Sequence, residues 1–195
     1  MSSKSARYGF VGASNHTDEV REVDDYYATD PHSVEMLLKN EKFCGDVWEC
    51  ACGGGHISEV LKAHGYNVFS TDLVDRGYGD PGIDFLNVNE KWMGDIITNP
   101  PFKLGLEFCK HAIDLIEDGH KVAMLLRINF LEGKKRGKFF KEYPPKTVYI
   151  HSKRVNCAKN GNLEDFNNGL IAYAWFIWEK PFPEQTVLKW LNNEL

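Results

Sequence analysis

The sequence Val-Trp-Glu-Cys-Ala-Cys-Gly-Gly-Gly at residues 47–55 joins an apolar run to three consecutive glycines, and a helical pattern follows from Ile57 to Ala63. The apolar and aromatic residues at its start predict a buried strand. Because glycine has no Cβ, the chain can turn sharply after this strand and its backbone can approach a ligand closely. The stretch therefore predicts a strand, a tight loop and a helix, which is the basic unit of an α/β fold.

The alternation of strand and helix patterns continues on both sides of this unit. Before it, Pro31 suits the first turn of a helix, and apolar residues recur on one face from Val34 to Leu38. This alternation predicts an α/β, Rossmann-like fold: a mostly parallel sheet with an antiparallel C-terminal strand and helices on both faces. Further strands are expected at 68–71, 83–86, 96–98, 122–126, 147–150 and 171–178, and further helices at 104–116, 131–141 and 186–191.

The length of 195 residues and a hydrophobic content of 43% suit one domain with a packed core. Residues 1–25 lack periodicity and are expected to form a flexible arm, which leaves a single domain over 26–195. The longest apolar run, Ile171 to Trp178, is too short to span a membrane, so no membrane contact is expected. Five cysteines without a C-x-x-C spacing predict neither a disulfide framework nor a metal site, and a reducing cytoplasm is the expected location.

Charge is distributed unevenly along the chain. The whole chain carries a net charge of −5, but residues 121–160 hold eleven lysines or arginines against two acids. Because a charged ligand responds to the local field, this basic segment, an insertion around 127–169, can bind nucleic acid on an acidic protein. A solvated helix face rich in lysine is the alternative interpretation.

Carboxylates follow the next two predicted strands and complete a possible nucleoside pocket with the glycine loop. Asp72 ends one strand, where it can accept hydrogen bonds from both ribose hydroxyls, and Asp84-Phe85 offers an acceptor for an exocyclic amine. The loop also nearly matches a nicotinamide-cofactor motif. Glu49 favours S-adenosylmethionine, because an acid before the loop repels a pyrophosphate and attracts a ligand with sulfonium and ammonium groups.

The segment Asn99-Pro100-Pro101-Phe102 follows the apolar run Ile96 to Thr98 and predicts a rigid turn at the end of a buried strand. An aromatic amine is a poor nucleophile, because its lone pair is delocalised into the ring. If Asn99 Oδ1 and the Pro100 carbonyl each accept one of its N–H groups, the nitrogen moves toward tetrahedral geometry and the lone pair can attack a methyl group. Phe102 is expected to stack on the target base. A proline-stiffened strand end is the alternative.

These residues resemble the class I S-adenosylmethionine-dependent amino-methyltransferases, and specifically the small phage- or prophage-type adenine-N6 DNA methyltransferases with an Asn-Pro-Pro-Phe motif. The resemblance covers the chain from about Tyr26 to Trp178. It implies that the cofactor site includes a segment ahead of the glycine loop, although Ala28 and Asp30 interrupt the usual spacing there. The cofactor-binding residues that it implies are Tyr27, Thr29, Glu49, Ala51, Cys52, Gly53, Gly55, Asp72, Leu73, Asp84 and Phe85.

The same resemblance gives the basic segment a role in holding DNA near the catalytic turn. The residues expected to contact phosphates are Arg127, Lys134, Lys135, Arg136, Lys138, Lys153 and Arg154. The expected activity is methyl transfer from S-adenosylmethionine to adenine N6 in DNA, with no metal. An RNA base methyltransferase, a protein glutamine N-methyltransferase, a nicotinamide-dependent enzyme and an inactive cofactor-binding subunit remain alternatives, and the oligomeric state is left open.

Overall fold

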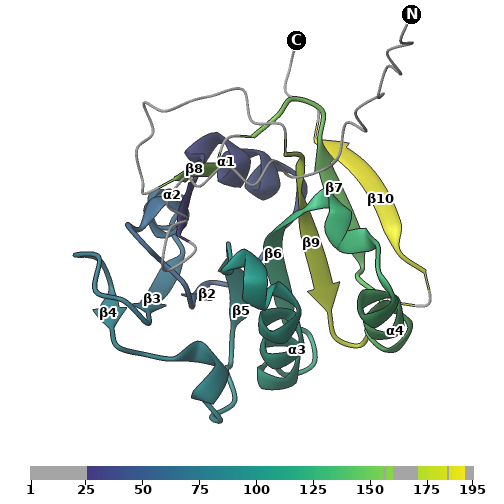
Figure 1. Ribbon diagram of the computed structural model, residues 1–195. Helices are drawn as coiled ribbons and strands as arrows, with labels where there is room; N and C mark the ends of the chain where they lie inside the picture. Colours follow the sequence, from purple (N-terminus) through teal and green to yellow (C-terminus); the bar gives the residue numbers. More distant parts are fainter. Residues whose placement is uncertain (1–25, 156, 160–170, 184, 192–195) are drawn as a thin grey trace, which may run out of the picture.

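An eight-stranded mixed sheet in the order β10-β7-β9-β6-β5-β2-β3-β4 forms the centre of the computed structural model, which describes residues 26–155, 157–159, 171–183 and 185–191 (Figure 1). Strand β9 runs antiparallel to both of its neighbours, β6 and β7, and the other pairs are parallel. The strands are β2 (Asp46–Glu49), β3 (Asn67–Asp72), β4 (Asp80–Pro81), β5 (Asp95–Thr98), β6 (Lys121–Arg127), β7 (Thr147–His151), β9 (Tyr173–Glu179) and β10 (Val187–Leu191).

Helices cover both faces of this sheet, as the sequence predicted (Figure 1). Successive side chains of a strand point to opposite faces. Accordingly, Ile96 packs in the cluster with α3 (Gly105–Leu115) and α4 (Lys134–Glu142). Its neighbour Ile97 packs in the cluster with α1 (Pro31–Asn40) and α2 (His56–Ala63). Three short 3₁₀ turns complete the layers: η1 (Phe85–Asn87), η2 (Phe102–Leu104) and η3 (Ile128–Leu131).

The strand order reverses between β2 and β5. From β2 the chain builds outward to β3 and β4, and then returns to place β5 on the other side of β2. In open α/β sheets, the carboxyl ends of the strands at such a reversal leave a crevice where ligands bind. The predicted glycine loop follows β2 and the predicted catalytic turn follows β5, so the fold brings both to this crevice.

A second, two-stranded sheet was not expected from the sequence. Strand β1 (Tyr27–Thr29) pairs antiparallel with β8 (Cys157–Lys159), which lies within the long aperiodic stretch after β7. Two strands of three residues carry too little periodicity to be recognised in isolation. The predicted flexible arm, residues 1–25, lies outside the described residues, as do residues 156 and 160–169 of the predicted basic insertion.

Two predicted elements are wrong. Residues 83–86 do not form a strand: Asp84 Oδ1 accepts the Leu86 N–H and starts the turn η1, while Asp80–Pro81 provides the edge strand β4. Residues 186–191 do not form a helix but mostly the strand β10, parallel to β7. The apolar pattern of residues 186–191 fits either a helix or a strand. The strand forms because the edge of β7 offers backbone N–H and C=O groups that need partners.

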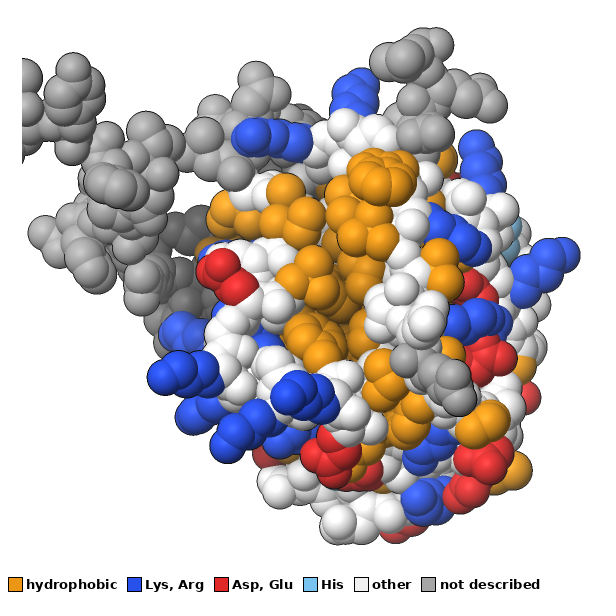
Figure 2. All heavy atoms as spheres, turned by 90° about the vertical axis from the view of Figure 1, so that its right-hand side faces the viewer, with side chains coloured by type: hydrophobic (Ala, Val, Ile, Leu, Met, Phe, Trp, Pro, Cys, Tyr) orange, Lys and Arg blue, Asp and Glu red, His pale blue; other side chains and the backbone are white. Residues whose placement is uncertain are grey.

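The face formed by α4 and β10 is partly apolar. Figure 2 shows hydrophobic side chains in a band on this side of the molecule, with lysines and arginines beside it. Strand β10 contributes Val187, Leu188 and Trp190, of which Trp190 is 60% exposed. Within the described part of the chain, no helix has the length and apolar character needed to cross a membrane.

Candidate functional site

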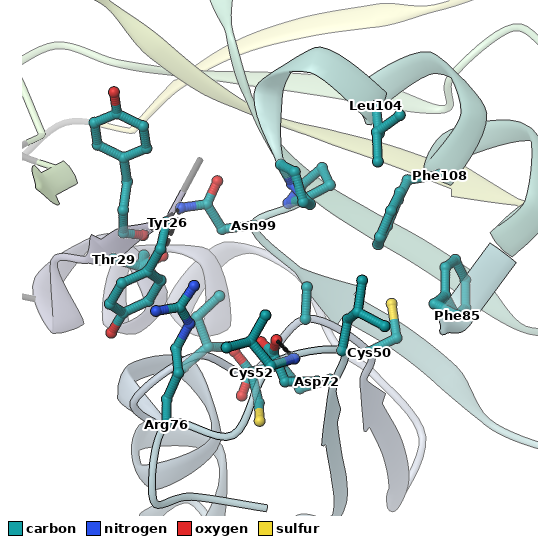
Figure 3. Close-up of a pocket in the computed structure, with 18 of the residues that line it drawn as sticks. Tyr26, Thr29, Cys50, Cys52, Asp72, Arg76, Phe85, Asn99, Leu104 and Phe108 are labelled. Atoms are coloured by element: carbon teal, nitrogen blue, oxygen red, sulfur yellow. Dashed lines mark hydrogen bonds between the residues drawn. The ribbon is translucent and has the colours of Figure 1, made fainter. Parts of the chain in front are cut away.

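A cavity of about 340 Å³ lies at the carboxyl ends of β2, β3 and β5 (Figure 3). Its volume is in the range of small-molecule and cofactor sites. The structure brings thirteen of the predicted cofactor and catalytic residues together around it: Tyr27, Thr29, Glu49, Ala51, Cys52, Asp72, Leu73, Asp84, Phe85, Asn99, Pro100, Pro101 and Phe102. Residues of the glycine loop and of the predicted catalytic turn therefore share one cavity.

Gly53 and Gly55 are the two predicted cofactor residues that do not line this cavity. Both have positive φ, +52° and +84°. A Cβ on Gly53 would lie 2.2 Å from the Tyr26 ring, and one on Gly55 would lie 2.5 Å from the Tyr78 ring. Because Gly53 and Gly55 have no side chain, the rings of Tyr26 and Tyr78 can pack directly against the loop. The positive φ angles of these glycines also allow the sharp turn that the sequence predicted.

Asp72, at the end of β3, fixes the loop that it faces. Its Oδ2 accepts the Gly53 N–H at 2.8 Å and its Oδ1 accepts the Val74 N–H at 2.9 Å. Each carboxylate oxygen can accept a further hydrogen bond. Asp72 can therefore hold the loop and still bind two hydroxyl groups of a ligand in the cavity.

Glu49, at the end of β2, is 1% exposed and is bound to the first turn of α2. Its Oε2 accepts the Ser58 N–H at 2.8 Å and the Ser58 hydroxyl. Burial raises the pKa of this carboxyl to about 8 despite these hydrogen bonds, and the charge of Asp72 adds to the rise. Glu49 therefore lines the cavity as a carboxyl group whose charge depends on its surroundings.

The far end of the cavity is apolar. Figure 3 shows Phe85, Leu104 and Phe108 on the side away from Arg76 and Tyr26. The Phe85 ring meets the Trp48 ring edge-on, with centroids 5.2 Å apart, so its orientation is fixed by the core. Asp84, which precedes Phe85, also lines the cavity, and its carboxylate accepts from the N–H of Leu86 and the side chain of Asn87.

The Asn99 side chain is held through its NH₂ group. Nδ2 donates to the Tyr27 carbonyl at 3.1 Å and to Thr29 Oγ1 at 3.0 Å, both on β1. A backbone carbonyl can only accept, so the NH₂ group must face it. Oδ1 is buried and has no hydrogen-bond partner among the described residues. The strand β1, which the sequence did not predict, thus orients a free acceptor at the end of β5 (Figure 3).

Phe102 lies in a cluster of aromatic rings beside Asn99. Its centroid is 4.9 Å from that of Tyr27 and 5.7 Å from that of Tyr173. The Arg127 guanidinium carbon lies 4.2 Å from the Phe102 ring centroid, within the range of a cation–π contact. Arg127 thus lies next to the predicted catalytic turn and contacts the ring expected to hold the substrate.

None of the predicted phosphate-binding residues lines the cavity, and Arg127 reaches it only through its contact with Phe102. Lys134, Lys135 and Lys138 are exposed on α4, and Lys153 and Arg154 are exposed after β7. Arg136 donates to the carbonyls of Glu132 and Asn129, so it caps the turn before α4. The structure therefore places one predicted cation beside the site and distributes the rest over the neighbouring surface.

Several lining residues were not predicted. Tyr26 is the clearest: its hydroxyl accepts the Gly54 N–H at 3.0 Å, and Arg76 stacks on its ring at 4.3 Å. Burial raises the pKa of the Tyr26 hydroxyl. Tyr26 immediately precedes the predicted Tyr27, but nothing local indicates that it packs on a loop 27 residues later. The other unpredicted lining residues are Ala28, Cys50, His56, Ile57, Val74, Arg76, Ile83, Lys103, Leu104 and Phe108.

No protein-family profile and no curated protein sequence matches this chain. Solved structures do match. A Listeria monocytogenes protein assigned as a class I S-adenosylmethionine-dependent methyltransferase superposes with a TM-score of 0.58 at 13% identity, over 89% of this chain and 68% of that one. A Vibrio vulnificus protein assigned as the modification subunit of a type I restriction enzyme gives 0.58 at 14% identity.

The Vibrio match covers 82% of this chain but only 45% of that protein. A Pyrococcus horikoshii protein assigned as an RNA methyltransferase gives a TM-score of 0.55 at 15% identity, over 78% of this chain and 86% of that one. At such identities the likeness is one of fold. It confirms the predicted Rossmann-like fold, which this chain shares with class I S-adenosylmethionine-dependent methyltransferases.

Proposed function

We propose that this chain is an S-adenosylmethionine-dependent methyltransferase that modifies an exocyclic amine of nucleic acid, with adenine N6 in DNA as the preferred target. The fold, shared with proteins assigned as methyltransferases, supports the general activity. The single cavity that joins Asp72 to Asn99 supports a reaction between a nucleoside-bearing donor and an amine.

The observation that carries the proposal is the orientation of Asn99. With Nδ2 bound to Tyr27 and Thr29, Oδ1 is a buried acceptor without a partner in the described part of the chain. An unsatisfied buried acceptor costs stability, and one beside a cavity is available to a ligand group that can donate to it. An amine N–H is the group that fits it.

The cavity residues fit S-adenosylmethionine. Asp72 can accept from ribose hydroxyls, Asp84 can accept from the adenine amine, and the apolar end offers Phe85 and Phe108 to the adenine ring. Glu49 can stabilise the positive groups of the methionine part. When bound, the cofactor supplies a methyl group on a positively charged sulfur.

The residues of the chain prepare the amine for this methyl group. Asn99 Oδ1 and the Pro100 carbonyl accept one N–H each, which draws the nitrogen out of conjugation and frees its lone pair. Methyl transfer to this nitrogen would form a nitrogen–carbon bond while the donor's sulfur–carbon bond breaks, and the methylated amine, held by these two acceptors, would then lose a proton to solvent. Phe102, supported by Tyr27 and Arg127, holds the base against the turn.

We favour nucleic acid as the substrate because cationic side chains lie at the carboxyl ends of the strands, where the proposed catalytic turn also lies. Arg127 is next to Phe102, and Lys103 lines the cavity itself. Lys134, Lys135 and Lys138 are exposed on α4, and Figure 2 shows lysines and arginines beside the apolar band on the side of the molecule where α4 lies. A target base must leave its stack to reach the cavity, and phosphate contacts hold the strand while it does so.

The test supplies the full chain with a labelled methyl donor and, separately, duplex DNA, single-stranded DNA, RNA and a glutamine-containing protein mixture. The product is digested and the modified unit identified. We expect N6-methyladenine from DNA. Label in RNA or in glutamine would support methyl transfer but show that the proposed substrate is wrong. The absence of label in every substrate, together with no binding of S-adenosylhomocysteine, would overturn the proposal.

A further inference from the structure

A cysteine, an aspartate and a histidine from three segments meet at the edge of the sheet opposite the cavity. Cys44 precedes β2, Asp95 is the first residue of β5, and His120 immediately precedes β6. Their potential ligand atoms, one sulfur, one oxygen and one nitrogen, all lie within 4.8 Å of one another. None of the three residues lines the cavity at the carboxyl ends of the strands.

The aspartate at the centre of this group is rigidly placed. Asp95 is 2% exposed, its Oδ2 accepts the Cys44 N–H at 2.6 Å, and its Oδ1 accepts the Lys121 N–H at 2.7 Å. Each oxygen retains a second lone pair, so these bonds position the carboxylate without using up its capacity to accept. The backbone therefore presents a fixed oxygen ligand between the other two side chains.

The histidine faces this carboxylate without bonding to it. His120 Nδ1 lies 3.5 Å from Asp95 Oδ1, beyond the usual hydrogen-bond length of about 2.7–3.2 Å. The nitrogen is buried, and within the described ranges it has no hydrogen-bond partner. Two ligand atoms about 2.0 Å from a tetrahedral metal lie about 3.3 Å apart, so the observed separation suits two ligands of one ion.

The neighbouring charges leave room for a cation. The Lys121 ammonium group donates to the Glu41 carboxylate at 2.7 Å and to the Lys42 carbonyl at 2.6 Å. It is therefore engaged elsewhere and does not neutralise Asp95.

We propose that Cys44, Asp95 and His120 form a binding site for one Zn²⁺ ion, with solvent at the fourth position. The combination of thiolate, imidazole and carboxylate favours zinc over the hard cations Mg²⁺ and Ca²⁺. Binding releases the thiol proton of Cys44. The ion joins the segments before β2, β5 and β6, and so stabilises this edge of the sheet rather than taking part in chemistry at the cavity.

The test uses the tag-free full chain, kept reduced with a phosphine, and measures metal binding alone. We expect one Zn²⁺ per chain with a dissociation constant below about 1 µM, measured by competition with a chromogenic chelator. Co²⁺ should give a thiolate-to-metal charge-transfer band at one equivalent. Zinc should also raise the midpoint of thermal unfolding, because it binds the folded state.

Cys44→Ser and His120→Asn should each weaken zinc binding by about 100-fold or more and remove the zinc-dependent rise in the midpoint. Cys157→Ser, a cysteine outside the group, should bind as the wild type does. Circular dichroism confirms that each variant is folded. Absence of the cobalt band in the wild-type chain, or its persistence in Cys44→Ser, would overturn the proposal. Neither result bears on methyl transfer, so the two proposals fail separately.

Discussion

The two ends of strand β5 carry polar side chains that are anchored in different ways. At its start, both oxygens of Asp95 accept backbone N–H groups, from Cys44 and Lys121. After its end, the Asn99 amide uses only its NH₂ group, which donates to Tyr27 and Thr29, and its oxygen has no partner among the described residues. Asp95 therefore joins the segments before β2 and at the start of β6 to β5, whereas Asn99 keeps its side-chain oxygen available as an acceptor.

The difference shows how a single strand can serve both stability and function. Buried polar groups are normally satisfied, and a carboxylate such as Asp95, which accepts a backbone N–H on each of its oxygens, fixes the chain around it. A half-bonded amide such as Asn99 is equally fixed but retains binding capacity toward the cavity. Mutations at the first end should therefore change stability, and mutations at the second should change activity.

The largest expected effect is that of Asp95→Ala. It leaves the Cys44 and Lys121 N–H groups without an acceptor, and should lower the free energy of unfolding by about 3–5 kcal/mol in urea titrations. Asp95→Asn keeps one acceptor and should lose about half as much. Asp46→Ala, an exposed aspartate on neighbouring β2, serves as the control. A loss below about 1 kcal/mol for Asp95→Ala would show that the two bonds are not the anchor.

Asn99→Ala should lower the rate of methyl transfer by about 10²–10³-fold, because it removes an acceptor that acts on the amine during reaction. Binding of S-adenosylhomocysteine, measured by calorimetry, should stay within about two-fold of the wild type, a change worth less than about 0.5 kcal/mol. Asn89→Ala, an exposed asparagine away from the cavity, is the control. Normal turnover by Asn99→Ala would contradict the role given to this side chain.

Glu49→Gln should change how stability depends on pH. The folded-state pKa of about 8 lies above the unfolded value, so the folded protein holds a proton that the unfolded chain has lost. Stability should thus fall as pH rises between about 4.5 and 8, by up to about 1.4 kcal/mol per unit.

The Gln variant cannot lose this proton, so its stability relative to the wild type should rise by about 2–3 kcal/mol between pH 5 and pH 7. Urea titrations at both pH values measure this difference. His151, whose pKa burial lowers to about 4, has the opposite pH dependence, but it is present in both proteins and cancels. Parallel stability profiles for the two proteins would mean that Glu49 is ionised in the folded state.

Thr29→Val should have the smallest effect. It removes one of the two anchors of Asn99 Nδ2 while the Tyr27 carbonyl keeps the other, and a single hydrogen bond is worth about 1 kcal/mol. The rate of methyl transfer should fall about five-fold, and the free energy of unfolding should fall by no more than about 1 kcal/mol. Thr186→Val, an exposed threonine, is the control. A weaker affinity for cofactor with an unchanged rate would instead assign Thr29 to cofactor binding.

Much of the site could be predicted because its chemistry follows strand ends. The glycine loop after β2, Asp72 at the end of β3 and Asn99 after β5 are marked by local residue types, and parallel strands bring their carboxyl ends to one edge. Tyr26 and Arg76 could not be predicted in the same way. Each lines the cavity through contacts with residues distant in sequence, which local patterns do not encode.

The elements that were predicted incorrectly are short or lie at the sheet edges. Residues 83–86 and 186–191 each fit two structures by pattern. At 83–86 a local contact, the Asp84 carboxylate that accepts the Leu86 N–H, decided for the turn, and at 186–191 a tertiary partner, the edge of β7, decided for the strand. Long, regularly patterned segments such as those of β6 and α3 were predicted correctly, because burial on one or both faces fixes their composition.

The sequence by itself determined the α/β alternation, the glycine loop and the rigid turn at residues 99–102, since each depends on neighbouring residues. Only the tertiary structure decided that β1 and β8 pair across the chain and orient Asn99, and that Cys44, Asp95 and His120 meet at the opposite edge. The physical reason is the range of the interactions. Backbone preferences and hydrophobic periodicity act over a few residues, whereas hydrogen bonds and ligand clusters join groups that only the folded chain brings together.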